Sequence, residues 1–223
     1  MKNRNMKSQI TTSYRTVPGL VTHALREGIL SGEFSGGMQL KQEELARKFS
    51  VSLSALREAL KSLESEGLVR FYPNRGVVVS ELSAAEAREI FDIRLFLELG
   101  ALELSVRQLT EAELQAAEGV LEAIDTEVDS TRWSELNWQF HEILYQAADR
   151  PKLLALLKTL HNNVERYMRL YLSTMQYQEK SQAEHRALLA ACRDRDIDRA
   201  QQLLRTHMAN ASSSLATYLN PQL

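Results

Sequence analysis

The chain has 223 residues, of which 44% are hydrophobic and 25% are charged, and its formal net charge is −2. This is the composition of a globular protein with one large or two small domains, and it excludes a largely disordered chain. No run of 18 apolar residues occurs and no hydrophobic segment follows Met1, so we expect neither a membrane span nor a signal peptide, and a cytoplasmic location.

The two parts of the chain differ in charge. Residues 1–80 hold 12 Lys and Arg against 7 Asp and Glu, a net charge of +5, whereas residues 81–223 hold 15 against 22, a net charge of −7. A basic excess confined to one region is what phosphate binding requires. The asymmetry therefore predicts that a nucleic acid would bind the N-terminal part.

The first residues predict an arm and a helix. Residues 1–13 are polar and basic, and we expect a flexible arm there. Pro18 suits the first turn of a helix, whose apolar residues fall on one side and which ends at Ser31-Gly32. This helix is predicted to close the domain that follows.

Segment 42–79 predicts two short helices joined by a tight turn and followed by a hairpin. Ser52 is placed to cap the second helix, and Gly67 supplies the left-handed residue that ends it. Residues 68–72 and 77–79 have strand character around a Pro-Asn-Arg-Gly turn. These elements form a winged helix–turn–helix. Its predicted core positions are Leu45, Phe49, Val51, Leu56, Ala59, Leu60 and Leu63.

Polar side chains gather on the solvent face of the second helix and at the hairpin tip. They are donors for phosphates and base edges. The same pattern fits a three-helix bundle fragment with ordinary surface charges, and pattern alone leaves both interpretations open. The residues concerned are Ser54, Arg57, Glu58, Lys61, Asn74 and Arg75.

From residue 81 onward the pattern is helical, without strand signals or a glycine-rich phosphate loop. Capping boxes beginning at Ser83, Thr110 and Ser181 mark helix starts. The predicted fold class is therefore mainly α, with an antiparallel six-helix bundle over residues 81–223. Cys192 cannot form an internal disulfide and is expected to be a small core residue. The six helices are placed at 84–107, 111–128, 131–148, 151–175, 181–193 and 197–219.

Three of the five histidines fall where one site could gather them. Asn137 and His141 are four residues apart and project from one helix face. His185 and His207 lie ten residues before and twelve after Arg195, or ~15 and ~18 Å from a turn placed there, so a helical hairpin brings them level. Core histidines remain the alternative to a metal site. The other two histidines, His23 and His161, are predicted to be surface or boundary residues.

Arg94 lies on a predicted helix whose neighbouring residues are apolar. A buried arginine needs a partner, and Glu98, four residues on, is the simplest one. Aromatic residues on the following helices are expected to belong to the core rather than to stack on a ligand. They are Trp133, Trp138, Phe140 and Tyr145.

The run ELARKFSVSLSALREALKSLESEGLVRFYPNRGVVV resembles the DNA-binding domain of the GntR family of bacterial transcription regulators. Leu53 and Ala55 depart from it, because the family usually has arginine and proline there. The resemblance implies a winged domain over residues 14–80. With Lys61 from the same helix face, the predicted DNA-binding residues at positions that match are Ser52, Ser54, Arg57, Asn74, Arg75 and Gly76.

Residues 84–223 resemble the FCD ligand-binding domain of the FadR branch, in its six-helix VanR-like form. The resemblance implies a divalent metal held by Asn137, His141, His185 and His207, where the family usually has aspartate in place of Asn137. Three imidazoles and one oxygen suit zinc, nickel or manganese, with open positions for a ligand. It also implies that Arg94 lines the pocket of a small carboxylate effector.

We therefore expect a homodimeric transcription regulator, a repressor, that binds a palindromic operator in double-stranded DNA and responds to a small organic acid. A metal-dependent hydrolase is the rival, because three histidines can activate water on zinc. Only Glu142 and Glu184 are placed as a general base, and over a third of the chain serves DNA binding, so we predict no enzyme. A DNA-binding protein without effector control is a second rival, which the size of the helical domain disfavours.

Overall fold

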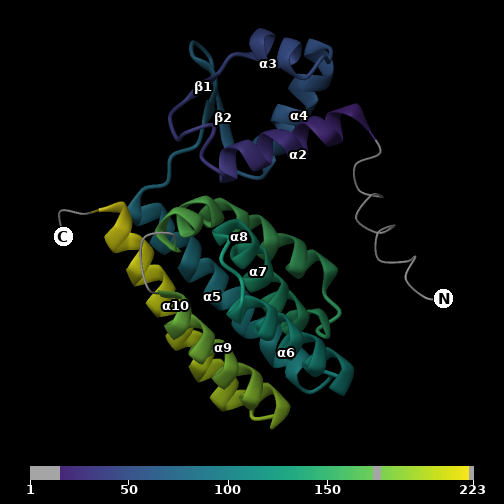
Figure 1. Cartoon of the computed structure of the whole chain (residues 1–223), viewed down its shortest axis with the longest axis vertical. Coiled ribbons are helices and arrows are strands. Elements are labelled where there is room, and N and C mark those ends of the chain that lie inside the picture. Colours follow the sequence, from purple (N-terminus) through teal and green to yellow (C-terminus); the bar gives the residue numbers. More distant parts are fainter. Residues whose placement is uncertain (1–15, 173–176, 221–223) are drawn as a thin grey trace. The chain divides into compact units, whose positions relative to one another are not determined.

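The computed structural model describes residues 16–172 and 177–220, and the chain divides into two compact units, residues 1–81 and 82–223. The fold is mainly α, as predicted, with one small sheet in the first unit (Figure 1). The predicted arm at residues 1–13 and the predicted helical residues 173–175 lie outside the described residues. None of the described helices has the length and hydropathy needed to span a bilayer.

The N-terminal unit has the predicted helices and hairpin and one strand more. The added strand, β1, pairs with β3 and places Gln39 opposite Val78, so that the antiparallel sheet has the order β1-β3-β2. Strand β1 was not predicted, because two residues are too few to show an alternation of apolar and polar side chains. The elements are α2 (Val17–Leu30), β1 (Gln39–Leu40), α3 (Gln42–Lys48), α4 (Leu53–Ser65), β2 (Val69–Tyr72) and β3 (Gly76–Val79).

Local signals set the ends of α4 as the sequence predicts. The Ser52 hydroxyl accepts a hydrogen bond from the backbone N–H of Ala55 at 3.2 Å, which satisfies one donor of the first turn. Gly67, after the helix end, has a φ of 75°, where a side chain would be strained. The turn between α3 and α4 also uses a left-handed residue, Ser50, with a φ of 55°. The helix–turn–helix is thus closed by backbone geometry at both ends of α4.

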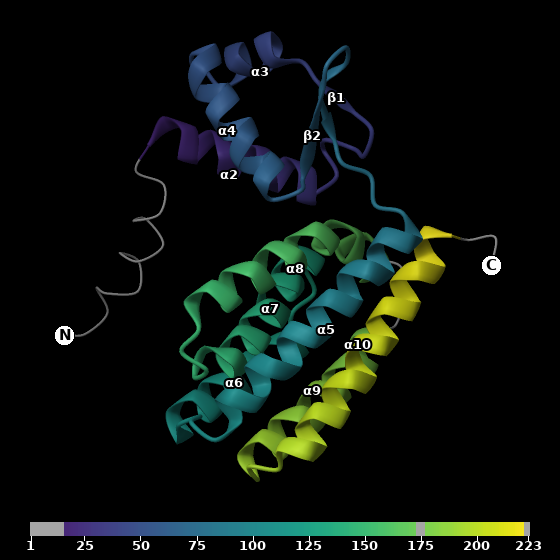
Figure 2. The same cartoon turned by 180° about the vertical axis from the view of Figure 1, so that it is seen from behind.

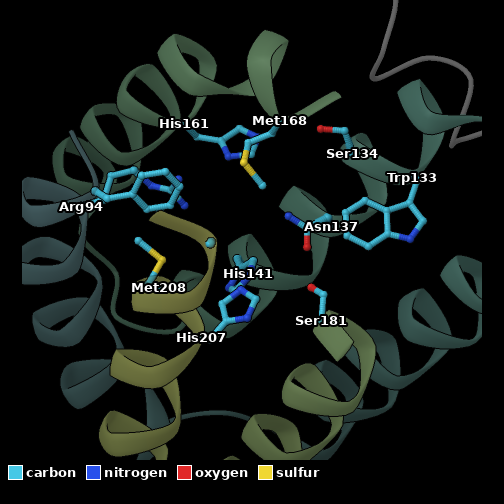
Figure 3. Close-up of a pocket in the computed structure, with 12 residues that line it drawn as sticks. Arg94, Trp133, Ser134, Asn137, His141, His161, Met168, Ser181, His207 and Met208 are labelled. Atoms are coloured by element: carbon cyan, nitrogen blue, oxygen red, sulfur yellow. The ribbon is translucent and has the colours of Figure 1, made fainter. Parts of the chain in front are cut away.

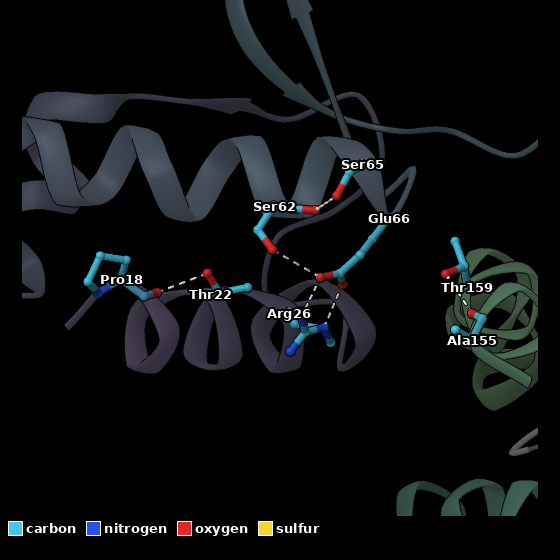
Figure 4. A network of polar contacts seen from close by, with 8 residues as sticks. All are labelled: Pro18, Thr22, Arg26, Ser62, Ser65, Glu66, Ala155 and Thr159. Carbon is cyan, nitrogen blue, oxygen red and sulfur yellow. Dashed lines mark hydrogen bonds and ion pairs between the residues drawn. The ribbon is translucent and has the colours of Figure 1, made fainter. Parts of the chain in front are cut away.

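The core of this unit contains the predicted apolar residues, including the fully buried Leu56, Leu60 and Leu63. An ion pair ties α2 to the end of α4, because the Arg26 guanidinium donates to both carboxylate oxygens of Glu66 at 2.7 and 2.5 Å (Figure 4). Both side chains are half-buried, so this two-point contact fixes the angle between the helices more than an exposed pair would.

Six helices form the described part of the C-terminal unit, as predicted. Helix α5 lies along α10 and also contacts α7 and α8, while α6 contacts α7 and α9 (Figure 2). The capping boxes at Ser83 and Thr110 are both present and start α5 and α6. The helices are α5 (Ala84–Val106), α6 (Glu111–Asp125), α7 (Ser130–Gln146), α8 (Pro151–Leu172), α9 (Tyr177–Arg193) and α10 (Ile197–Leu219).

The third capping box is a wrong prediction. Helix α9 begins at Tyr177, so Ser181 lies inside it, and Ser181 is buried. Gln178, Glu179 and Lys180, which precede Ser181, are good helix formers. They therefore continue the helix on the N-terminal side of the Ser-x-x-Glu pattern. Glu184 is consequently free of capping and serves the histidine cluster described below.

Candidate functional sites

The surface of α4 presents the predicted polar residues. Ser54, Arg57 and Lys61 are exposed, and Nε of Arg57 donates to Oε1 of Gln42 at 3.0 Å, which orients the guanidinium from α3. Ser52 is also exposed, although its hydroxyl is engaged in the helix cap. Leu53, at the position where the resemblance predicts arginine, is 40% exposed and does not belong to the core.

The tip of the β2–β3 hairpin presents the other predicted DNA-binding residues. Asn74 and Arg75 are exposed, and Gly76 has a φ of 67°, which permits the tight turn. The side-chain amide of Gln39, on β1, donates to the backbone carbonyl of Arg75 at 2.6 Å. The unpredicted strand therefore supports the hairpin tip from the side.

The three predicted histidines meet in the C-terminal unit. His141 comes from α7, His185 from α9 and His207 from α10, and all three are buried. Their ring centroids are 4.7 to 5.3 Å apart. One ligand nitrogen from each lies within 4.8 Å of the other two. The helical-hairpin argument for His185 and His207 is thus confirmed by the structure.

Each of these histidines has Nδ1 hydrogen-bonded to a different neighbour. The partner of His141 is the hydroxyl of Tyr145 at 3.3 Å, and the partner of His207 is the Glu184 carboxylate at 2.8 Å. The partner of His185 is Oε1 of Gln182 at 3.2 Å. The sequence analysis had placed Glu184 beside the histidines but had not indicated Tyr145 or Gln182 as partners.

The partners fix which nitrogen of each ring carries the proton. The Tyr145 hydroxyl donates to Glu98 at 2.7 Å, so its oxygen is left to accept from His141. The Gln182 amide nitrogen donates to the Leu121 carbonyl at 3.0 Å, so its oxygen accepts from His185. With Nδ1 protonated, Nε2 of each ring offers a lone pair.

The remaining nitrogen of His185 tests whether these residues fit a metal ion. Its Nε2 is buried and has no hydrogen-bond partner. A buried polar atom without a partner is costly, and a metal ion is one of the few groups that remove this cost for an imidazole lone pair. The residues present therefore fit a divalent cation.

Burial keeps His141 and His185 in the neutral form that a metal requires. Removal from water, then the charges of His207 and Arg94, lowers the pKa of His141 well below its ordinary value. Burial likewise lowers the pKa of His185, followed by the influence of His207 and His141. Burial is the largest influence on Glu184 and opposes its ionisation. The hydrogen bond to His207 and the charge of that ring, the hydrogen bond from Asn210 and the charge of Lys180 together outweigh burial and hold the carboxyl pKa below its ordinary value. His141 and His185 are thus neutral nitrogen donors near the Glu184 carboxylate.

Arg94 forms the predicted ion pair with Glu98. Its Nε donates to Oε1 of Glu98 at 2.9 Å, and both side chains are buried. Glu98 also accepts from Tyr145, so a continuous chain of hydrogen bonds runs from Arg94 to His141. Among the described residues, the two terminal nitrogens of Arg94 have no hydrogen-bond partner. The guanidinium is therefore held at one edge and open at the other.

A pocket adjoins the cluster and contains Asn137 and Arg94 (Figure 3). In Figure 3 the side-chain oxygen of Asn137 is turned toward the side of the pocket on which His207 and Ser181 lie. The cavity has a volume of about 30 Å³. The other residues that line it are Phe91, Trp133, Ser134, His141, His161, Met168, Met208 and Ala211.

Two pocket residues were assigned elsewhere by the sequence. His161 was predicted to be a surface or boundary residue but is buried, and its ring lies 4.7 Å from that of Trp138. His161 stands four residues before Glu165, and this spacing places both side chains on one helix face. The spacing could have indicated from the sequence that the two side chains lie together. Ser181 was predicted to be a helix cap. The four aromatic residues assigned to the core are all buried, although Trp133 also lines the pocket.

Cys192 is fully buried and belongs to the core, as predicted. Burial raises the pKa of its thiol to about 12. The thiol of Cys192 therefore stays protonated at neutral pH and does not act as a nucleophile.

The two units define a class of protein, a regulator with a DNA-binding unit followed by a helical unit. Residues 20–79 match the bacterial regulatory proteins of the gntR family, and residues 89–210 match the FCD domain. The chain belongs to the GntR family of bacterial transcription regulators, in the group that carries an FCD domain.

Relatives over most of the chain agree with this. The uncharacterized HTH-type transcriptional regulator YdhC of Bacillus subtilis is 31% identical over 82% of this chain and 84% of that protein. The gluconate operon transcriptional repressor of the same organism is 32% identical over 68% of this chain and 62% of that protein. The structure of E. coli McbR/YncC has the same fold, with a TM-score of 0.75, 22% identity and coverage of 92% and 99%. These families are regulators and not enzymes, which excludes the hydrolase alternative.

Proposed function

We propose that this regulator is a homodimer that represses transcription from a palindromic operator, and that a metal-bound small carboxylate in its helical unit changes operator affinity. One short recognition helix reads only a few base pairs, and a two-fold dimer doubles the site that is read. The relative that represses the gluconate operon supports a repressor.

The proposed DNA contacts divide by chemistry. Arg57, on the exposed face of α4 and oriented by Gln42, is assigned to a base edge in the major groove. Lys61, one turn further on, and Arg75 at the hairpin tip are assigned to phosphates. The remaining proposed contacts are Ser52, Ser54, Asn74 and Gly76.

The observation that carries the metal proposal is the buried Nε2 of His185, which has no partner, beside two imidazoles with the same tautomer. His141, His185 and His207 would hold the ion, with the amide oxygen of Asn137 as the fourth protein ligand. Nitrogen donors with one oxygen suit zinc, nickel or manganese. The bound ion would supply a positive charge that attracts a carboxylate into the pocket.

The proposed effector is a small carboxylate. The open edge of Arg94 lies in the same pocket as Asn137, His141 and His207, so an anion there would meet both the guanidinium and the proposed metal ion. A cavity of about 30 Å³ holds roughly two water molecules, which limits the effector to a few atoms unless the pocket expands. The effector acts only if it binds one arrangement of the dimer more tightly than the other.

Metal-dependent thermal stability tests the site. Protein stripped with a chelator should melt at a higher temperature on addition of zinc, nickel or manganese, because the ion binds the folded state. At a metal concentration one hundred times the Kd, the free energy of unfolding should increase by about 2.7 kcal/mol. His185→Ala should abolish the rise, and Asn137→Asp should enlarge it, since a carboxylate adds a full charge. His23→Ala, a histidine of the other unit, serves as the control.

The outcome separates the two halves of the proposal. Equal metal responses in wild type, His185→Ala and Asn137→Asp would refute the metal site and leave the DNA-binding function intact. Fluorescence anisotropy with operator DNA then tests the effector: added carboxylates should change operator affinity in the metal-loaded protein, and no change with any of a series of short organic acids would refute effector control.

A further inference from the structure

Helix α5 carries an apolar stripe that faces solvent. Phe96 is 74% exposed, and Ile93 and Leu104 are 40% and 41% exposed. The three side chains share one face of the helix with Gly100, because they follow one another at spacings near whole helical turns. Scattered exposed apolar residues are normal, but a stripe along one helix face marks a contact surface.

The rest of the described C-terminal unit leaves this stripe uncovered. The opposite face of α5 contains Ala87, Phe91, Ala101 and Leu102, all buried, and contacts α7, α8 and α10. Figure 2 shows α5 on the near side of the unit beside α10, with no other helix of that unit in front of it. The stripe is therefore the solvent-facing side of α5.

The stripe is complementary to itself when two copies lie antiparallel. Phe96 and Gly100 stand two residues to either side of the level of Glu98, so a two-fold axis there places each Phe96 over the Gly100 of the other copy. A Cβ at Gly100 would meet no atom within 4 Å, so the space beside it is open. Ile93 and Leu104, five and six residues from the same level, then face one another. A bulky side chain thus meets a gap at the centre of the contact.

The ends of the stripe carry complementary charges. Glu89 and Arg107 lie nine residues before and nine after Glu98, or ~14 Å along the helix in each direction. The same two-fold axis brings each Glu89 opposite the Arg107 of the other copy. Neither side chain has an ion-pair partner within the part of the chain that the structure describes. Apolar groups at the centre and paired charges at the rim are the usual anatomy of a protein interface.

We propose that two copies of this chain associate through antiparallel packing of α5 against α5, with Phe96 and Gly100 at the centre and Glu89–Arg107 pairs at both ends. This proposal rests on the homodimer of the proposed function and identifies its contact surface. Because the other face of α5 carries Arg94 and Glu98, the same helix would join the dimer contact to the buried pocket.

Sedimentation equilibrium on the full-length protein tests this contact. Phe96→Glu should raise the dimer Kd at least tenfold, because it buries two charges at the two-fold axis. Leu156→Glu, on the exposed face of α8 and 47% exposed in the wild type, is the matched control and should leave the Kd unchanged. Circular dichroism melting curves of both variants check that they fold.

Charge reversal gives a second measure that does not depend on the apolar centre. Glu89→Arg and Arg107→Glu should each weaken the dimer, because each places like charges opposite one another at both ends. The double variant should restore the wild-type Kd. A dimer that survives Phe96→Glu and shows no restoration would overturn the α5 contact but leave the homodimer. A wild type that stays monomeric with and without operator DNA would overturn the homodimer and this contact together.

Discussion

At the residue scale, the properties of the histidine cluster depend on the groups that contact it. The tautomers of His141, His185 and His207 are set by a phenol, an amide and a carboxylate respectively. Partners of this kind commonly change metal affinity ten- to a hundredfold when they are removed. The ligands alone therefore do not describe the site.

Replacement of Tyr145 tests this dependence. In Tyr145→Phe the Nδ1–H of His141 loses its acceptor, and Glu98 loses one donor. We expect metal affinity to fall by about ten- to a hundredfold, measured by calorimetric titration of the chelator-stripped protein. Tyr72→Phe, an exposed tyrosine in the other unit, should bind metal as the wild type does. Unchanged affinity in both variants would mean that the His141 ring is held by packing alone.

The DNA-binding surface gives a second prediction at this scale. Arg57→Ala should weaken binding to the operator by about 1–3 kcal/mol with little effect on scrambled DNA, if its guanidinium reads a base edge. Lys61→Ala should weaken binding to both DNAs alike and lower the salt slope by about one. Titrations of both DNAs over a series of salt concentrations measure these effects. Equal losses on the two DNAs for Arg57→Ala would reassign it to a phosphate.

The sequence located the three histidines and Glu184 but not the contacts of Tyr145 and Gln182 with them, and the reason is geometric. His185 and His207 flank a turn, so helical rise alone predicts that they are level. Tyr145 and Glu98 are 47 residues apart on two helices, and their contact depends on how α5 and α7 pack. Sequence spacing contains no information on such a contact.

At the scale of the element, boundaries followed the strength of the local signal. Thr110 and Glu113 satisfy each other's backbone N–H groups, and α6 begins there as predicted. Ser181 and Glu184 have the same spacing, but the residues before them continue the helix. Strand β1 has two residues, too few to show the alternating pattern of a strand. Its pairing with β3 is a tertiary contact that the local sequence does not predict. A capping pattern thus predicts a helix start only where the preceding residues disfavour a helix.

The two serine/threonine positions can be compared directly. Thr110→Ala removes a real cap and should lower the free energy of unfolding of the C-terminal unit by about 0.5–2 kcal/mol. Ser181→Ala lies in the interior of α9 and loses no capping bond, so the change should be smaller. Urea denaturation followed by circular dichroism measures both. A larger loss from Ser181→Ala would show that its hydroxyl makes a structural hydrogen bond in the pocket.

At the scale of the whole molecule, charge and chemistry are divided between the two units. The basic excess falls in residues 1–80, which contain the helix–turn–helix, while residues 81–223 are acidic and contain the histidine pocket. An acidic helical unit is repelled by DNA phosphates, which leaves the winged unit as the part that approaches them. The net charge of −2 conceals this division.

The pH dependence of stability should differ between the units. In the metal-free protein, the buried His141 and His185 have pKa values below their ordinary value, whereas the unfolded chain has ordinary ones. As the pH falls through about 6.5, the unfolded state binds protons that the folded state does not, so the free energy of unfolding decreases by up to ~1.4 kcal/mol per pH unit for each histidine. Above that range these groups contribute no slope.

Tryptophan fluorescence isolates this effect, because both tryptophans, Trp133 and Trp138, lie in the C-terminal unit. Urea denaturation at pH 5.5 and at pH 7.5 should give a lower free energy of unfolding at the lower pH. His185→Gln should reduce the difference. A difference of the same size in this variant would assign the pH dependence to other groups.

The labelling rate of the single cysteine can report motions of the helical unit. Cys192 has no exposed surface and lies on α9, the helix that also carries His185. A thiol reagent reaches it only when α9 separates from its neighbours, so the rate of labelling at neutral pH reports the free energy of that local opening. Ions or acids that bind across α7, α9 and α10 should slow the reaction in proportion to their occupancy. An unmodified protein can therefore be screened for its effector by the reactivity of one sulfur atom.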